Sequence, residues 1–173
     1  LFEALRRDGE DVIIFAHVGG RYADIGIAHD PAIETAVAVH SSWGTFEWIV
    51  HDAFDLGYRV GIVANSDGHK GRPGAEGPGA SMFGAYGGLT CLQMPELTRD
   101  ATFEALRARR HYATTGSRML LDVRTAFDGE TLAFDADPVL GPCTHHLAGT
   151  LPMGAIVHST GSHARLHISV CSD

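Results

Sequence analysis

A short apolar run followed at once by a carboxylate and an imidazole constrains this sequence more than any other feature. Residues 58–64 (Tyr-Arg-Val-Gly-Ile-Val-Ala) are typical of a buried β-strand, and Asn-Ser-Asp-Gly-His comes directly after them. Asp67 and His69 therefore stand two residues apart, just past the carboxyl end of the strand, where both side chains can point at one ion. Hydrolases on α/β scaffolds hold divalent metals at such strand ends. The pattern favours an α/β fold with a site at one edge of its sheet.

Two further apolar runs each end in a histidine. Residues 11–17 and residues 36–40 are both typical of buried parallel strands. Signals for helix starts lie after them: Asp30 followed by Pro31 predicts a short helix, and Thr45 is expected to cap a longer one. This order of strand, loop, helix and strand predicts a parallel sheet with helices outside it.

The second half of the chain changes character. Residues 71–95 are rich in Gly and Pro and predict a long loop, and Thr98 begins a helix with early acidic residues and late arginines. Farther along, segments alternate apolar and polar residues around turns, which is typical of antiparallel strands. We therefore expect an α/β part over residues 1–124 and the start of an all-β module over residues 125–173.

Composition excludes several classes of protein. The 173 residues, 45% of them hydrophobic, amount to about one domain, and the net charge of −8 argues against a protein that wraps nucleic acid. The odd count of three cysteines argues against a disulfide framework, and their lack of Cys-x-x-Cys spacing argues against a zinc finger. No apolar run approaches the ~20 residues that span a bilayer. We expect a soluble protein without membrane or nucleic-acid partners, with a cytoplasmic location slightly favoured.

Four side chains are candidate metal ligands: His17, His40, Asp67 and His69. Each ends or closely follows a predicted strand, and the carboxyl ends of parallel strands meet at one edge of a sheet. Three imidazoles and one carboxylate suit zinc, manganese or iron better than calcium. A histidine at a strand end is also often only a hydrogen-bonded core residue, so that interpretation stays open for His17 and His40. Asp67 and His69 are in addition the candidate catalytic residues.

Three cations lie just after the candidate ligands: Arg21, Lys70 and Arg72. Cations beside a metal cluster can hold an anionic substrate, and arginine can do so with two parallel hydrogen bonds. The alternative is ordinary solvated charge on a loop. We interpret the three residues as candidate substrate-binding groups.

Several segments resemble the PHP (polymerase and histidinol phosphatase) superfamily, and are closest to a bacterial branch of large PHP-like proteins. They are residues 17–21 (His-Val-Gly-Gly-Arg), residues 39–47 (Val-His-Ser-Ser-Trp-Gly-Thr-Phe-Glu) and residues 57–74, which include Asn-Ser-Asp-Gly-His-Lys-Gly-Arg-Pro-Gly. Residues 96–116 fit the same branch, so the resemblance covers roughly residues 10–124.

The resemblance implies the C-terminal part of a distorted (β/α) barrel of PHP type, with metals at the carboxyl ends of its strands. By this match His17 is a ligand from a later strand, and Asp67 and His69 are the closing ligand pair. His40 falls where some members carry a further ligand, whereas Ala38 stands where many members have Glu. The implied cofactors are two or three divalent ions, Zn, Mn or Fe, and the implied reaction is phosphoester hydrolysis.

One departure from the family bears on activity. The opening His-x-His strand of the family and the ligands after it have no match in this sequence. We therefore expect a C-terminal fragment that lacks the N-terminal part of its own domain and is inactive alone. The intact protein is expected to be a metal-dependent phosphoesterase acting on a small phosphorylated or other anionic substrate.

Two alternatives remain open. An amidohydrolase-type enzyme would cleave C–N or C–O bonds with a similar metal site, although no lysine at a predicted strand end suggests the carbamylated lysine of that class. A non-catalytic scaffold or binding module whose metal site has decayed is the third possibility.

Overall fold

The structure is a computed structural model and describes residues 2–7, 11–17, 23–69, 71 and 87–172. Its elements in the first half of the chain are α1 (Phe2–Arg7), β1 (Phe15–His17), β2 (Ala36–Ser41), β3 (Gly44–Thr45), α2 (Trp48–Asp55), β4 (Gly61–Ala64), β5 (Leu89–Leu92) and α3 (Arg99–Arg107). Those in the second half are β6 (His111–Thr114), β7 (Met119–Phe127), β8 (Thr131–Phe134), η1 (Pro138–Leu140), β9 (His145–Leu147), β10 (Leu151–Pro152), β11 (Ile156–Ser159) and β12 (Ala164–Ser172).

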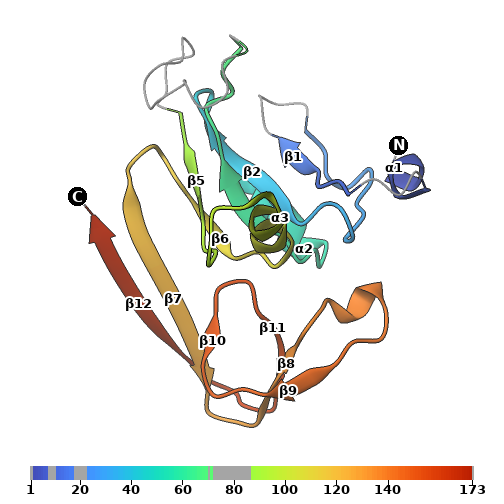
Figure 1. The fold of residues 1–173 in the computed structure, drawn as a ribbon, viewed down its shortest axis with the longest axis vertical. Coiled ribbons are helices and arrows are strands. Elements are labelled where there is room, and N and C mark those ends of the chain that lie inside the picture. Colours follow the sequence, from blue (N-terminus) through green and yellow to red (C-terminus); the bar gives the residue numbers. More distant parts are fainter. Residues whose placement is uncertain (1, 8–10, 18–22, 70, 72–86, 173) are drawn as a thin grey trace.

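The α/β part is built around β2, which lies in the upper part of Figure 1. β2 pairs in parallel with β1 on one side and β4 on the other, so that Ala36 lies opposite both Phe15 and Gly61. Its Ala-Val-Ala-Val sequence suits a strand that is buried on both faces. The short β3 turns back and pairs antiparallel with the end of β2.

Helices cover both faces of this small sheet. On one face Val37 and Val60 pack with Ile49 and Ala53 of α2. On the other face Ala36, Ala38 and Val63 form a second cluster. Phe15 of β1 packs against this cluster, and so does Leu106 of α3. The alternation along β2 thus sends successive side chains into two apolar layers, and the three-layer core fixes where the strand ends lie.

Side chains join β4 to its other neighbours. β5 and β6 form their own antiparallel pair, with Cys91 opposite Tyr112. The Thr90 hydroxyl accepts a hydrogen bond from Ala64 N at 3.0 Å and donates to Ala64 O at 2.7 Å. His111 Nδ1 lies 3.0 Å from Ile62 O. These bonds satisfy backbone groups of β4 that a regular ladder would otherwise pair.

The β part occupies the lower and left sides of Figure 1. β7 and β12 form a nine-residue antiparallel ribbon in which Met119 lies opposite Ser172 and Phe127 opposite Ala164. β10 joins the other edge of β7, and β8 pairs with both β11 and β9 in a second sheet. Every residue of β12 is exposed.

The predicted fold class, a partial (β/α) barrel, is wrong. Within the described residues the strands form several small sheets, most of them antiparallel, and no sheet closes into a barrel. Of the strands that the structure describes, only β1, β2 and β4 pair in parallel. The barrel expectation failed because β5 and β6 pair with each other instead of continuing the parallel order.

Individual elements were predicted with mixed success. The strand at residues 36–40 is confirmed as β2, and the helix capped by Thr98 is confirmed as α3, with Thr98 Oγ1 accepting from Ala101 N at 3.2 Å. The helix expected at Asp30 is only a single turn, in which the Asp30 carboxylate and carbonyl accept from the next residues. Glu47, not Thr45, stands at the N-cap of α2.

Two further expectations concern longer stretches. The predicted loop at residues 71–95 includes a strand, β5, and the predicted domain boundary after residue 124 falls inside β7. The division into two domains stays a prediction. Among the helices that the structure describes, none has both the length and the apolar character to cross a membrane.

Candidate functional site

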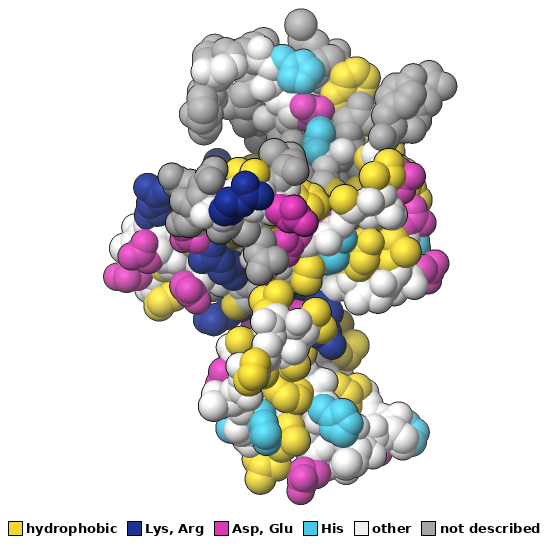
Figure 2. Space-filling view, turned by 90° about the vertical axis from the view of Figure 1, so that its right-hand side faces the viewer, with side chains coloured by type: hydrophobic (Ala, Val, Ile, Leu, Met, Phe, Trp, Pro, Cys, Tyr) yellow, Lys and Arg dark blue, Asp and Glu magenta, His cyan; other side chains and the backbone are white. Residues whose placement is uncertain are grey.

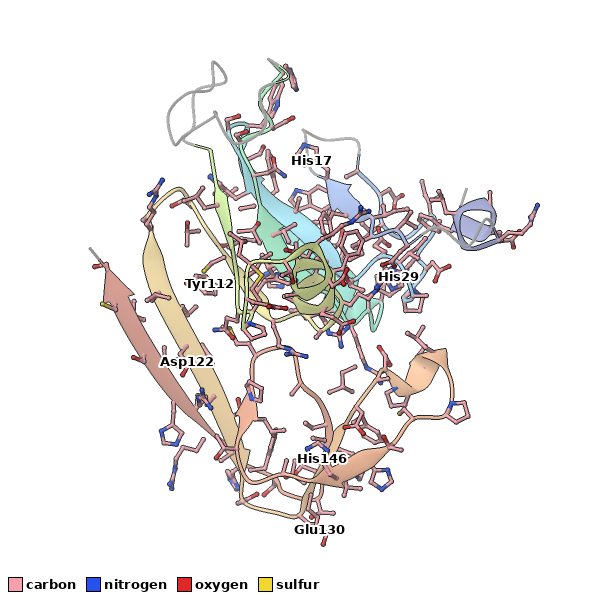
Figure 3. All side chains as sticks on the ribbon, in the orientation of Figure 1. His17, His29, Tyr112, Asp122, Glu130 and His146 are labelled. Carbon is pink, nitrogen blue, oxygen red and sulfur yellow. The ribbon has the colours of Figure 1, made fainter. Side chains whose placement is uncertain are left out.

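Three of the four candidate ligands lie together at the end of β1 and in the loop after β4. His17 Nε2 is 3.2 Å from Asp67 Oδ2, and His69 Nε2 is 3.1 Å from Asp67 Oδ1. Figure 3 shows His17 at the upper end of β1. The carboxylate therefore lies between two imidazoles and uses a different oxygen for each. Residues 50 positions apart in sequence meet here because β1 and β4 run parallel on either side of β2.

The loop after β4 holds Asp67 in an unusual backbone conformation. Asp67 has a φ of +51°, in the left-handed region that Asp tolerates better than most residues. Its backbone N–H donates to the side-chain oxygen of Asn65 at 2.8 Å, an Asx turn that closes the loop. The Ser66 hydroxyl accepts from Gly68 N at 3.2 Å, and the Ser42 hydroxyl donates to Ser66 O. These local bonds fix the direction of the carboxylate.

The cluster is open to solvent on its imidazole side. The side chains of His17 and His69 are 37% and 62% exposed, whereas that of Asp67 is 16% exposed. The carboxylate is thus the inner group and the imidazoles are the outer ones. Water competes with exposed hydrogen bonds of this kind, so each of the three side chains can give up its present hydrogen bond and bind a ligand instead.

The structure gives His40 a different neighbour. His40 lies on β2 and is buried, with Nδ1 2.7 Å from the Thr45 hydroxyl. Gly88 packs directly beside the ring, since a Cβ on Gly88 would lie 2.8 Å from His40 Cδ2. His40 also lines a cavity of about 440 Å³ between α2 and the start of β7. The interpretation of His40 as a packed core residue therefore has direct support.

The candidate substrate cations Arg21, Lys70 and Arg72 lie outside the described residues. Their proposed role stays a prediction. Across the described ranges, no group of three or more His, Cys, Asp or Glu side chains is arranged to hold one metal ion. The His17–Asp67–His69 cluster is accordingly two His–Asp pairs that share a carboxylate.

A second group of charged and titratable side chains lies at the junction of the α/β and β parts. The Arg59 guanidinium donates to the carboxylate of Asp137, which is 7% exposed. Burial, the largest effect, lowers the pKa of Arg109, the nearby Asp137 raises it, and Arg59 lowers it. Burial also lowers the pKa of His111, whose bond to Ile62 opposes that shift.

Sequence patterns did not single out this second group. Arg109 and His111 follow α3, where late arginines are explained by the helix dipole alone, and Arg59 lies in a predicted strand. Asp137 is 78 residues beyond Arg59. The only local signal was a cationic run at the end of a helix, which cannot show that a distant carboxylate will pack against it.

Comparisons with known proteins give one match. No curated protein and no solved structure matches the chain. The model of the family described as protein of unknown function (DUF3604) matches residues 74–173, a range that follows the His17–Asp67–His69 cluster and includes Arg109, His111 and Asp137. Because the match covers more than half of the chain, the protein belongs to the DUF3604 family.

Proposed function

We propose that the intact protein is a metal-dependent hydrolase that acts on phosphoesters, with His17, Asp67 and His69 of this chain among its metal ligands. One observation carries the proposal: a carboxylate at a strand end lies within 3.2 Å of two imidazole nitrogens. Two imidazoles and a carboxylate are a ligand set typical of zinc, manganese and iron sites.

The separations between these donor atoms support the proposal. Ligand atoms that each lie about 2.1 Å from one metal ion, at angles of about 90° to 110°, are about 3.0 to 3.4 Å apart. The His17–Asp67 and His69–Asp67 distances of 3.2 and 3.1 Å fall in this range. Each imidazole has its own carboxylate oxygen, so the two pairs suit a carboxylate shared between neighbouring ions. A complete site needs donors beyond these three.

The residues of the chain would orient the site and hold the substrate. Asn65 and Ser66 fix the loop that carries Asp67, and Ser42 ties that loop to the end of β2. When bound, a divalent metal supplies a Lewis acid and makes hydroxide available near neutral pH. Lys70 and Arg72, with Arg21, would neutralise the anionic oxygens of a small phosphorylated substrate. The resemblance to the PHP superfamily supports the same reaction.

Metal binding and hydrolysis test the proposal together. We would titrate the intact protein with Mn²⁺ and Zn²⁺ by calorimetry and assay its hydrolysis of phosphomonoesters and phosphodiesters with and without metal. The test variant is Asp67→Asn. The matched control is Asp128→Asn, which alters a more exposed carboxylate that also lies beside an imidazole, that of His163, at 3.0 Å. We expect Asp67→Asn to weaken metal binding by about tenfold or more and Asp128→Asn to leave it unchanged.

The outcomes separate the alternatives. Equal metal binding by the two variants would rule out Asp67 as a ligand. Binding that depends on Asp67, with hydrolysis of amides and no hydrolysis of phosphoesters, would favour an amidohydrolase. Absence of both binding and hydrolysis would favour a non-catalytic scaffold.

A further inference from the structure

A cavity of about 760 Å³ lies where the α/β part meets the β part. Its apolar lining comes from both parts: Phe54, Tyr58, Tyr112, Leu121, Met153 and Val157. In Figure 3, Tyr112 lies between the upper sheet and the strands below. The volume is that of a site for a small organic molecule, and apolar and aromatic walls with few polar groups are typical of such sites.

The connection between β10 and β11 forms one wall of the cavity, against the end of α3. Gly154 in this connection has a φ of +83°, and a Cβ there would lie 2.0 Å from Ala108 O. Figure 1 shows this connection reaching up to the elements of the α/β part. Close backbone packing on this side makes the cavity a built feature of the junction.

The two tyrosine hydroxyls beside the cavity already have hydrogen-bond partners. The Tyr58 hydroxyl donates to Ile25 O at 3.2 Å, and the Tyr112 hydroxyl donates to Met119 O at 2.6 Å and accepts from Leu121 N at 3.1 Å. The two tyrosines therefore present their rings to the cavity while their hydroxyls bond elsewhere.

Positive charge remains at one end. Arg59 and Arg109 both line the cavity, and among the described residues of its lining there is no Asp or Glu. One carboxylate, Asp137, stands beside the two guanidinium groups: it bonds Arg59 and raises the pKa of Arg109. Two cations against one anion leave an excess charge of +1. Partial burial of Arg109 makes an added anionic partner favourable there, because a desolvated cation gains more from pairing. In Figure 2, hydrophobic and Lys or Arg side chains meet at the waist between the two lobes.

We propose that this junction cavity, defined by Arg59, Arg109 and the six apolar residues named above, binds a small amphipathic anion. The ligand has an aromatic or branched apolar body, which the rings and aliphatic side chains contact. It carries one carboxylate, sulfonate or phosphate group, which Arg109 receives. The site is separate from the His17–Asp67–His69 cluster and does not depend on the proposed hydrolase activity.

Two fluorescent probes of similar shape test the proposal. 1-Anilinonaphthalene-8-sulfonate has an aromatic body and one anionic group, and N-phenyl-1-naphthylamine has the same body without the charge. We expect saturable binding of the sulfonate at one site per chain. Arg109→Met is expected to weaken sulfonate binding by about tenfold and to leave the neutral probe unaffected. The matched control is Arg124→Met on β7, an exposed arginine that pairs with Asp122 at 2.9 Å and lies outside the cavity lining.

Two more variants locate the probe. Val157→Trp is expected to fill the cavity and block both probes. Ile168→Ser, on the exposed strand β12, is expected to change neither, and a loss of binding there would place the probe on the outer surface and overturn the proposal. Equal sulfonate affinity of Arg109→Met and wild type would also overturn it. If Arg109→Met loses both probes, Arg109→Lys decides: recovery of sulfonate binding supports the proposal, and no recovery overturns it.

Discussion

The carboxylates of Asp67 and Asp137 both pair with basic side chains, but the partners of Asp67 are exposed and Asp137 itself is buried. Asp67 joins two exposed imidazoles at the open end of a sheet, whereas Asp137 is 7% exposed and is paired with Arg59 at the junction of two parts of the fold. An exposed pair contributes little to stability because water competes for each partner, while a buried charge that loses its partner is costly. The His17–Asp67–His69 cluster can therefore exchange its hydrogen bonds for bonds to a ligand, whereas the stability of the junction depends on its charge pairs.

The substitution expected to destabilise the protein most lies at the junction. Gly154→Ala places a Cβ 2.0 Å from Ala108 O at a backbone angle that L-residues rarely adopt. We expect the free energy of unfolding to fall by about 3 kcal/mol, from the clash and the strained φ together. Urea denaturation measures the change. The control is Gly149→Ala, where an added Cβ has no neighbour within 4 Å among the described residues. Equal stability of the two variants would show that the β10–β11 connection does not pack on α3.

The second prediction compares the two carboxylates directly. Asp137→Asn keeps an oxygen for Val139 N but removes the charge that faces Arg59 and Arg109. We expect it to lower the free energy of unfolding by about 2 kcal/mol, less than for a fully buried pair because Arg59 is 44% exposed.

Asp67→Asn in the absence of metal is the counterpart at the open end of the sheet. We expect it to change the free energy of unfolding by less than about 1 kcal/mol, since both imidazoles are exposed. Denaturation of both variants at pH 7 and low salt makes the comparison. A larger effect for Asp67→Asn than for Asp137→Asn would reverse the distinction drawn between the two regions.

A third prediction concerns the helices on the two faces of the sheet. The Thr98 side chain caps α3, whereas Glu47 at the N-cap of α2 makes no capping hydrogen bond. Thr98→Ala is expected to lower the free energy of unfolding by about 1 kcal/mol, and Glu47→Ala by less than about 0.5 kcal/mol. Urea midpoints at equal slope measure both. Similar losses for the two variants would mean that α2 is held at its start by a contact other than packing of Ile49 and Ala53.

The sequence patterns succeeded where structure is set locally and failed where it is set by distant partners. The Ala-Val-Ala-Val run of β2 and the Thr98 cap are readable because burial on both faces and a side-chain cap leave short signatures. The barrel was wrong because nothing local shows that Cys91 will pair antiparallel with Tyr112. Sheet order depends on which strands pair, and one of these strands, β5, lies in a Gly-rich segment whose composition predicts a loop.

The candidate site divides in the same way. The proximity of Asp67 and His69 follows from a two-residue spacing, and the approach of His17 follows from parallel strands that end at one edge. The junction group was not predictable, because Arg59 and Asp137 come from segments 78 residues apart with unrelated patterns. Pairing across such separations is decided by packing of the whole chain.

The smallest expected effect is a pH dependence that tests how closed the junction is. His111 is buried, and burial lowers its pKa below the ordinary 6.5, while its bond to Ile62 partly opposes the shift. The unfolded chain therefore binds more protons than the folded chain below about pH 6.5, so stability rises with pH through that window and levels off above it. The contribution of His111 is present at neutral pH and is lost as the pH falls.

His111→Gln is expected to flatten the low-pH part of the stability profile, whereas His158→Gln, at an exposed histidine of β11, is expected to leave it unchanged. Urea midpoints from pH 7.5 down to about 5.5 measure the slope. A wild-type profile that His111→Gln does not alter would show that water reaches the imidazole. The junction would then be open, its charges would be screened like those around Asp67, and the contrast between the two regions would vanish.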